Sequence, residues 1–300
     1  MAAVAVSYVV DGPSDAPPVL LSSSLGATAD MWEPQVAALA DRFRLVRYDH
    51  RGHGRSPVPP GAYELADLGA DALALLDRLE IEKAHLAGLS LGGMVAMWLA
   101  AHAPDRVDRL VLISTSAKLG PPQAWAERAA TVRAGGTGAV ADTVVGRWFT
   151  PEHAAAHPDV VARYRDMIAA TPPDGYAACC GAIERMDLEP ELARIRAATL
   201  VIAGSDDPAT PPVHAERITA GIAGATVEFL PGTAHLANVS AADTVNELLG
   251  AVRFAQRLLL VEGQGGTSGK RQRDDPKTKL SNQIHGCLLE WAKLGWILSL

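Results

Sequence analysis

Three residue types that together can activate a hydroxyl nucleophile occur in this chain in the order serine, acid, histidine. The first, Ser90, has Gly88 and Gly92 on its two sides and lies between a short apolar run, 84–87, and an apolar stretch of helix length, 93–100. This pattern is typical of a nucleophile elbow, a turn so tight that the flanking positions must lack side chains. The elbow presents the hydroxyl at a helix N-terminus, where backbone N–H groups stabilise an oxyanion.

A serine hydroxyl reacts only when a base takes its proton, and the base needs a partner that orients it. His235 follows the apolar run 225–230 in a loop, which is where a general base is expected. After the preceding run, 200–203, come Asp206 and Asp207. We predict that Asp207 orients the histidine, and that Asp206 caps the helix that follows. The predicted catalytic residues are therefore the serine, Asp207 and His235.

An oxyanion also needs two backbone donors. The N–H of Leu91, next to the serine, is the first. The apolar run 19–21 is followed by a loop that ends at Gly26, a residue that permits close backbone approach, so we predict the N–H of Leu25 as the second donor. One such donor stabilises the transition state by about 3 kcal/mol.

Short apolar runs alternate with segments of helix length along most of the chain. The runs are 19–21, 45–48, 85–87, 110–113, 200–203 and 225–230, and the helical segments are 32–40, 65–79, 93–103, 214–220 and 241–259. This alternation predicts a mostly parallel sheet covered by helices on both faces. The first ten residues are apolar and contain no lysine or arginine, which favours a first strand over a signal peptide.

The interval 118–196 breaks this alternation, because it contains aromatic residues and Pro/Gly joints but no clear strand. It predicts a helical lid inserted into a core made of residues 1–117 and 197–260, above the carboxyl edge of the sheet. Residues 261–300 are expected to form a linker and a C-terminal tail. The apolar end of this tail is too short and too charged for a membrane span. Docking on the domain, self-association and an accidental extension are all open hypotheses for it.

Composition and charge exclude several classes of function. The 300 residues are 48% hydrophobic and 20% charged, with a formal net charge of −7, and no long basic run precedes the tail. Nucleic acid is therefore not an expected partner. The three cysteines and nine histidines show no metal-ligand spacing, so we expect no metal, and a reducing cytoplasm is the expected location. The polar loop 49–56 is interpreted as structural, with its side chains bonded to backbone.

Taken together, these residues resemble the α/β-hydrolase superfamily over about residues 1–258. The resemblance lies in Ser24-Leu25-Gly26, the loop 49–56, the elbow, the Asp207 loop and His235. Ser23-Ser24 stands where many members carry His-Gly. Four further stretches look like the 3-oxoadipate enol-lactonases: 23–26 with Met31-Trp32, 147–151, 176–183 and 186–188.

This resemblance implies the α/β-hydrolase fold and a serine hydrolase without a cofactor. Its implied reaction opens the lactone ring of 3-oxoadipate enol-lactone to 3-oxoadipate through an acyl-enzyme, a step of the β-ketoadipate pathway of aromatic catabolism. The alternatives are a broad carboxylesterase or a cofactor-free perhydrolase on the same fold, since the lid sets the substrate. A non-catalytic ligand-binding protein is a further alternative.

The implied substrate is a small lactone that carries a carboxylate, and an acidic protein needs a local cation to bind it. The predicted lid offers Arg133, Arg147 and Arg163. Arg147 stands beside Trp148, so the indole would cover the ring while the guanidinium pairs with the carboxylate. The alternative is that Arg147 caps or solvates a lid helix.

Overall fold

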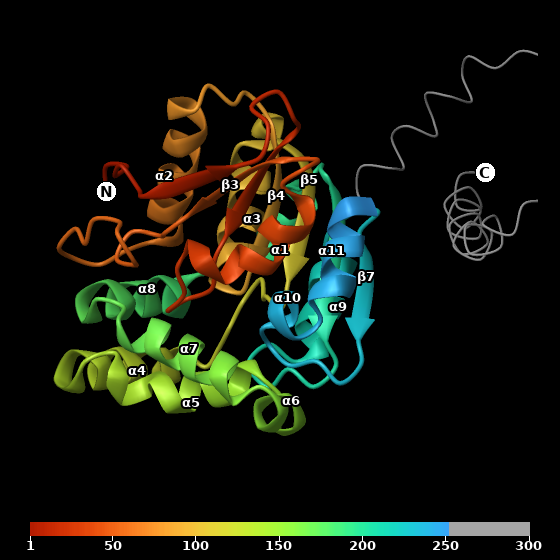
Figure 1. The fold of residues 1–300 in the computed structure, drawn as a ribbon. Coiled ribbons are helices and arrows are strands. Elements are labelled where there is room, and N and C mark those ends of the chain that lie inside the picture. Colours follow the sequence, from red (N-terminus) through yellow and green to blue (C-terminus); the bar gives the residue numbers. More distant parts are fainter. Residues whose placement is uncertain (252–300) are drawn as a thin grey trace, which may run out of the picture. The chain divides into compact units, whose positions relative to one another are not determined.

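A single seven-stranded sheet forms the centre of the structure, a computed structural model that describes residues 1–251 (Figure 1). The predictions for the tail 261–300, and for the last helix beyond residue 251, lie outside the described residues. The strands are β1 (Tyr8–Asp11), β2 (Pro18–Ser22), β3 (Arg44–Tyr48), β4 (Ala84–Leu89), β5 (Val107–Ile113), β6 (Ala198–Gly204) and β7 (Thr226–Leu230). Their order across the sheet is β1-β3-β2-β4-β5-β6-β7, with β1 antiparallel to β3 and every other pair parallel.

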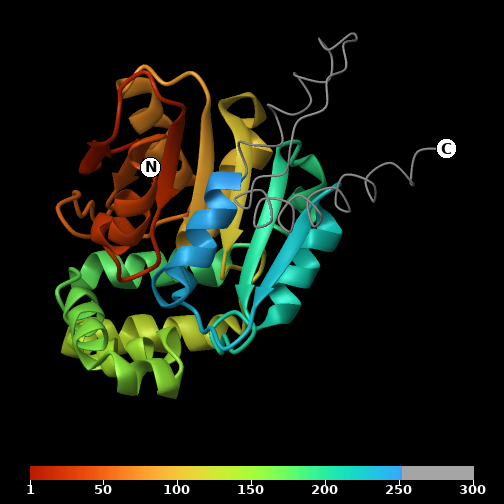
Figure 2. The same cartoon turned by 45° about the vertical axis from the view of Figure 1, so that its right-hand side comes forward.

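Helices cover both faces of this sheet (Figures 1 and 2). The α-helices that flank it are α1 (Glu33–Leu39), α2 (Leu65–Arg78), α3 (Leu91–His102), α9 (Pro212–Gly221), α10 (Ala237–Ser240) and α11 (Ala242–Ala251). Helices α1 and α11 pack on each other over one face, and α2, α3 and α9 cover the other. The described residues also form three short 3-10 helices, at Ala29–Trp32, Pro104–Arg106 and Glu189–Arg194. The predicted sheet with helices on both faces is therefore confirmed.

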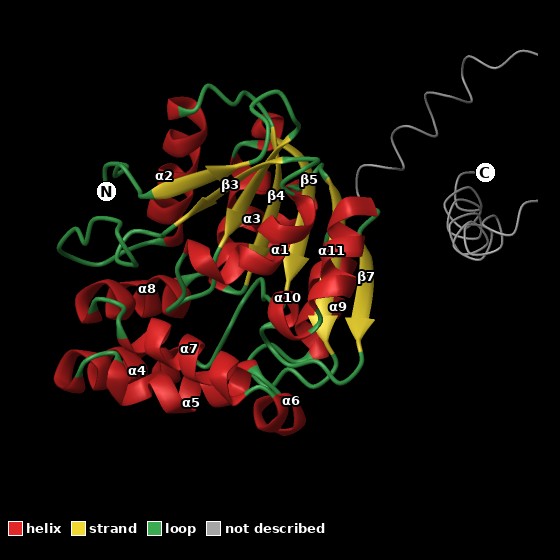
Figure 3. Cartoon of the chain, viewed as in Figure 1, coloured by secondary structure: helices red, strands yellow, loops and turns green. Residues whose placement is uncertain are grey.

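Five consecutive helices lie between β5 and β6 in the chain, with no strand among them. They are α4 (Pro122–Gly135), α5 (Gly138–Trp148), α6 (Pro151–Ala156), α7 (Pro158–Ala169) and α8 (Pro173–Arg185). The arrowheads of β5 and β7 point toward this layer, so the helices lie beyond the carboxyl ends of the strands (Figure 3). The helical insertion thus occupies the edge of the sheet where ligands of parallel sheets bind.

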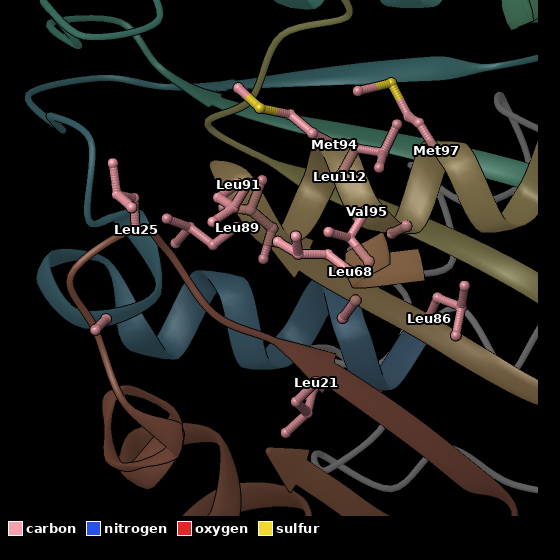
Figure 4. Packing of buried hydrophobic residues seen from close by; sticks show 14 of the residues in the cluster. Leu21, Leu25, Leu68, Leu86, Leu89, Leu91, Met94, Val95, Met97 and Leu112 are labelled. Carbon is pink, nitrogen blue, oxygen red and sulfur yellow. The ribbon is translucent and has the colours of Figure 1, made fainter. Parts of the chain in front are cut away.

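Helix α3 is apolar around most of its circumference, and the structure buries nearly all of it. Met94, Val95 and Met97 pack in the core with Leu86 of β4 and Leu112 of β5 (Figure 4). Such a helix is stable only when neighbours cover every face, and here the sheet and α2 do so. The element that begins at the candidate nucleophile is therefore held rigidly by burial.

The first strand is shorter than predicted. It spans Tyr8–Asp11, whereas the sequence indicated a strand over the first ten residues. Two backbone N–H groups ahead of it donate to side chains, that of Val4 to Asp71 and that of Ser7 to Ser56, at 2.7 and 2.8 Å. These hydrogen bonds to side chains take the place of the backbone hydrogen bonds that a longer first strand would form with its neighbour. Among the described residues, no helix has the length and apolar character needed to cross a bilayer.

Candidate active site

Ser90 occupies a strained turn between β4 and α3. Its backbone has φ 57° and ψ −118°, a conformation that non-glycine residues rarely adopt. A Cβ on Gly88 would lie 2.2 Å from the carbonyl oxygen of Gly92, and a Cβ on Gly92 would lie 1.9 Å from the carbonyl oxygen of Ser22. Both flanking glycines are therefore required by close backbone approach, as the elbow pattern predicts.

Hydrogen bonds fix this turn on both sides. The N–H of Ser90 donates to the carbonyl of Ile113 at the end of β5, at 3.0 Å. The Thr115 hydroxyl donates to the Ser90 carbonyl at 2.7 Å. The serine side chain itself is only partly buried and lines a pocket under the α4–α8 layer. The elbow thus presents one hydroxyl to the pocket while its backbone is held in place.

Asp207 and His235 meet in the loops after β6 and β7. Nδ1 of His235 lies 2.8 Å from Oδ2 of Asp207, and both residues are only 3% exposed. The carboxylate also accepts from the Thr210 hydroxyl at 2.7 Å and from the backbone N–H groups of Ala209 and Thr210 at 2.8 and 3.0 Å. Because Nδ1 faces the carboxylate, Nε2 is the ring nitrogen available to a serine. Asp206, the competing acid, is exposed.

The surroundings keep Asp207 ionised. Burial alone would raise the pKa of this carboxyl group, but the charge of His235 and the hydrogen bonds from His235 and Thr210 outweigh that effect and lower the pKa. An ionised acid beside a buried imidazole stabilises the imidazolium that forms when the histidine takes a proton. Among the hydrogen bonds of residues 1–251, none joins His235 to Ser90, but both side chains line the same pocket.

Within the described residues, the loop after β2 leaves the backbone N–H of Leu25 without an acceptor. The N–H of Ser24 donates to the sulfur of Met31, that of Gly26 to His53, and that of Ala27 back to the Ser24 carbonyl. Within the described residues the N–H of Leu25 has no partner, and Leu25 lines the pocket. The N–H of Leu91 opens helix α3 and therefore lacks an intrahelical acceptor. Both predicted donors are thus backbone groups free to bind an oxyanion.

The pocket that contains Ser90 and His235 has an empty volume of about 510 Å³, its open mouth included. Its walls come from the loops after β2, β6 and β7, from the elbow and α3, from three helices of the layer, α4, α5 and α8, and from the loop ahead of α4. The lining residues are Ser24, Leu25, Ser90, Met94, Leu119, Trp125, Arg128, Val144, Arg147, Trp148, Tyr176, Ile183, Ala209, Thr210 and His235. A small, partly apolar molecule fits such a site.

The predicted lid arginines lie in three different environments. Arg147 lines the pocket beside Trp148. Arg163 lies outside it and pairs with Glu33 at 2.6 Å. Arg133 is exposed on α4 and does not line the pocket. Of the three, only Arg147 therefore has the position that a substrate contact requires.

A second arginine, which was not among the predicted site residues, also lines the pocket. Arg128 lies on α4, with its guanidinium 5.1 Å from the ring centre of Trp125 and 5.9 Å from that of Tyr176. Within residues 1–251 neither Arg128 nor Arg147 forms an ion pair, and the buried Tyr176 hydroxyl has no hydrogen-bond partner. Burial raises the pKa of Tyr176 and the two arginines partly oppose this, so both charges act on the Tyr176 hydroxyl. In the sequence, the only indication of this role was that Arg128 follows Trp125 by three positions, which places both side chains on one face of a helix.

The polar loop 49–56 has the structural role that its sequence suggested. Asp49 accepts from the backbone N–H groups of Ala29 and Arg55, at 2.8 and 2.9 Å. The buried Arg51 pairs with Asp71, with Nε 2.5 Å from Oδ2. Within residues 1–251, no three histidine, cysteine or acidic side chains are grouped so that they could hold a metal ion.

The fold and this site define the class of the protein. The family model described as "alpha/beta hydrolase fold" matches residues 17–242, which is well over half of the chain. The chain therefore belongs to the α/β hydrolase family, and the predicted fold class is confirmed.

Comparison with individual relatives shows which members of the family the chain resembles. The chain is 39% identical over 249 residues to 3-oxoadipate enol-lactonase 2 of Acinetobacter baylyi, which covers 83% of this chain and 93% of that protein. It is 41% identical to the enol-lactonase of Burkholderia xenovorans LB400, whose crystal structure superposes with a TM-score of 0.80 over 82% of this chain and 95% of that one. The resemblance to the enol-lactonases is thus confirmed, and the chain is an ester-hydrolysing enzyme.

A differently named relative is also similar. The chain is 36% identical over 248 residues to the Variovorax paradoxus protein named "Putative carbamate hydrolase RutD", covering 81% of this chain and 93% of that protein. The fold and the pattern of serine, acid and histidine therefore do not by themselves select the substrate.

Proposed function

We propose that this enzyme opens the lactone ring of 3-oxoadipate enol-lactone and releases 3-oxoadipate. The observation that carries the proposal is one pocket that is lined by Ser90 and His235 and also by Arg128 and Arg147, two arginines that have no acidic partner within residues 1–251. A nucleophile and a local excess of positive charge suit an ester that bears a carboxylate. The names of the relatives at 39% and 41% identity support the same substrate class.

In the proposed mechanism Asp207 holds Nδ1–H of His235, so that Nε2 takes the proton of Ser90. The serine oxygen attacks the lactone carbonyl. The carbonyl oxygen becomes an oxyanion that accepts hydrogen bonds from the N–H groups of Leu25 and Leu91. These donors are backbone groups on rigid elements, so little reorganisation is needed when the charge develops.

Collapse of this intermediate breaks the ring C–O bond and leaves an acyl-enzyme. The leaving oxygen belongs to an enol, which receives the proton from His235 and tautomerises to a ketone. Water then gives a proton to His235 and attacks the acyl carbon, and the serine leaves with that proton. The enolic leaving group is stabilised by resonance, so ring opening is favourable without a metal or an organic cofactor.

The carboxylate of the substrate is proposed to bind to the two arginines that line the pocket. Arg147 and Arg128 donate charge-assisted hydrogen bonds to it, and the Tyr176 hydroxyl, which has no partner in the described structure, supplies a third donor. Trp148, buried and in edge contact with Tyr164 at 6.1 Å, forms an apolar wall for the lactone ring. In this arrangement residues 118–196 act as the lid of the site.

Comparison of substrates tests this proposal. We expect the kcat/KM for the enol lactone, followed by loss of its ultraviolet absorbance, to exceed by at least about 100-fold that for p-nitrophenyl acetate and for a small carbamate, because two charge-assisted contacts act only on the lactone. Equal values for lactone and neutral ester would favour a broad carboxylesterase. Preference for the carbamate would contradict the proposed substrate while leaving the nucleophile in place. The wild-type protein and Ser90→Ala are assayed together, so that contaminating esterases are subtracted.

A further inference from the structure

The histidine at position 53 forms a contact that links the polar loop to the proposed oxyanion hole. Its Nε2 lies 2.9 Å from the backbone nitrogen of Gly26, the residue after Leu25. Both partners are buried, and they are 27 positions apart in the chain. Since an amide N–H can only donate, Nε2 of His53 must be the acceptor.

The contact of the other ring nitrogen, Nδ1, defines the tautomer of His53. Nδ1 of His53 lies 3.3 Å from the carbonyl oxygen of Arg51, which can only accept, so Nδ1 carries the hydrogen. Burial, the largest effect, lowers the pKa of His53 to about 4, although the Arg51 carbonyl and the charge of Asp49 oppose it. The ring is thus neutral near pH 7, and its lone pair is available to Gly26.

The loop that receives this contact is a tight turn around the proposed donor. The N–H of Ala27 donates to the Ser24 carbonyl at 3.1 Å, which closes a four-residue turn. Gly26, in the third position, has φ +82°, as a type II turn requires. Because a peptide unit is planar and trans, holding the Ser24 carbonyl also directs the Leu25 N–H to the opposite side.

One peptide in this turn is not fixed by the turn itself. Type I and type II turns differ by a flip of the central peptide, here the one between Leu25 and Gly26. The hydrogen bond from Gly26 to His53 holds this peptide in a single orientation. On the N-terminal side, the contact from the Ser24 N–H to the sulfur of Met31, at 3.3 Å, holds the peptide between Ser23 and Ser24. The Leu25 N–H therefore lies between two anchored peptides.

We propose that His53 is a positioning residue for the oxyanion hole: by accepting the Gly26 N–H, it holds the turn that presents the Leu25 N–H to the reacting carbonyl. The inference rests on the proposed role of Leu25. It assigns a catalytic consequence to a buried side chain that does not line the pocket.

Two substitutions separate this role from simple packing. In His53→Gln the amide oxygen reaches about as far as Nε2 and still accepts from Gly26. In His53→Asn the shorter side chain reaches only the position of Nδ1, so it keeps the contact to Arg51 and loses the one to Gly26. His102→Gln, on the exposed end of α3, controls for the change of residue type.

We expect His53→Asn to lower kcat about 10- to 100-fold with KM changed less than about 3-fold, since loss of a whole donor costs about 100- to 1,000-fold. His53→Gln should stay within about 3-fold of the wild type, because it restores the acceptor. A trifluoromethyl ketone that adds to Ser90 should bind His53→Asn more weakly by the same factor as kcat falls. The product 3-oxoadipate, which forms no oxyanion, should bind unchanged.

Equal kcat values for His53→Asn and His53→Gln, with both proteins folded, would overturn the proposal. So would a loss of kcat in His53→Asn without weaker binding of the ketone. If His53→Asn does not fold, ¹⁵N NMR of the wild-type histidines decides, since the proposal requires a neutral His53 protonated on Nδ1, and a proton on Nε2 would contradict it. A wild-type protein that forms no ketone adduct would instead overturn the proposed function, and this inference with it.

Discussion

Nδ1 of His235 lies 2.8 Å from Oδ2 of Asp207, although the two residues come from loops after different strands, 28 positions apart. The exposed neighbour Asp206 makes no such contact among the described residues. The parallel order of β6 and β7 explains this meeting, because their carboxyl ends lie side by side at one edge of the sheet. The structure thus distinguishes Asp207 from Asp206, two adjacent acids that the sequence pattern alone does not separate.

The first prediction uses this adjacent pair. Asp207→Asn should lower kcat by about 10³- to 10⁴-fold, because the amide neither fixes the required tautomer of His235 nor stabilises its charge. Asp206→Asn should leave kcat within about 2-fold of the wild type, since an exposed acid contributes little. Steady-state rates with p-nitrophenyl acetate measure both. A large loss in Asp206→Asn with an active Asp207→Asn would reverse the assignment.

The second prediction concerns binding of the substrate carboxylate. Arg128→Gln and Arg147→Gln should each raise KM for the enol lactone about 10- to 100-fold, as expected for loss of one charge-assisted hydrogen bond. Hydrolysis of neutral p-nitrophenyl acetate should change less than about 3-fold. Arg163→Gln, which loses an exposed pair with Glu33 and a contact with the ring of Tyr164 outside the pocket, is the matched control. Equal losses on the charged and the neutral substrate would show that these arginines do not recognise the carboxylate.

The third prediction concerns stability against acid. Burial lowers the pKa of His50 to about 3 and that of His53 to about 4. Between these values and the unfolded value near 6.5, the unfolded chain binds protons that the folded protein does not. The free energy of unfolding should therefore fall as the pH drops from about 6.5 to about 4, by up to about 1.4 kcal/mol per pH unit for each histidine.

Urea unfolding at several pH values measures how the free energy of unfolding depends on pH. Matched variants then identify the residues that cause this pH-dependent slope. His53→Gln should lose part of this pH dependence of the free energy of unfolding, because one of the histidines whose pKa burial lowers is gone. His102→Gln, at the surface, should keep it. An unchanged slope in His53→Gln would show that the fold does not suppress protonation of that ring.

The fourth prediction compares a glycine of the elbow, Gly92, with a glycine of helix α5, Gly146. Gly92→Ala should destabilise the protein by about 3 kcal/mol or more, since its methyl group would lie 1.9 Å from a backbone oxygen that has little freedom to move. Gly146→Ala, in the last turn of α5 with open space around the new methyl group, should instead stabilise the helix by about 0.5–1 kcal/mol. Thermal unfolding compares the two, and a Gly92→Ala protein as stable as the wild type would contradict the close approach.

Much of this architecture follows from local patterns in the chain. The glycines around Ser90 predict the elbow because the required space is set by atoms within a few residues of it. The strands are predictable because every buried run is short and bounded by polar or turn residues. The order of Ser90, Asp207 and His235 predicts their association because parallel strands bring their carboxyl ends to one edge.

What could not be predicted depends on packing between distant segments. Arg128 contacts Trp125 on its own helix and Tyr176 on α8, and only the association of α4 with α8 brings its charge to the pocket. Likewise the polar character of His53 suggested a contact with backbone, but nothing near it in sequence identifies Gly26 as the partner. Nor does local sequence explain why the first strand begins at Tyr8, since the residues ahead of it bond to Asp71 and Ser56.

The most direct test of the account is to label the enzyme with a fluorophosphonate and locate the modified residue by mass spectrometry of its peptides. We expect one phosphonyl group per wild-type molecule, on Ser90, with loss of hydrolysis in proportion to labelling. Ser90→Ala should take up none, and His235→Ala should react at least about 100-fold more slowly, because the base is missing. Labelling of another residue, or full hydrolytic activity in Ser90→Ala, would contradict the central claim that Ser90 is the nucleophile.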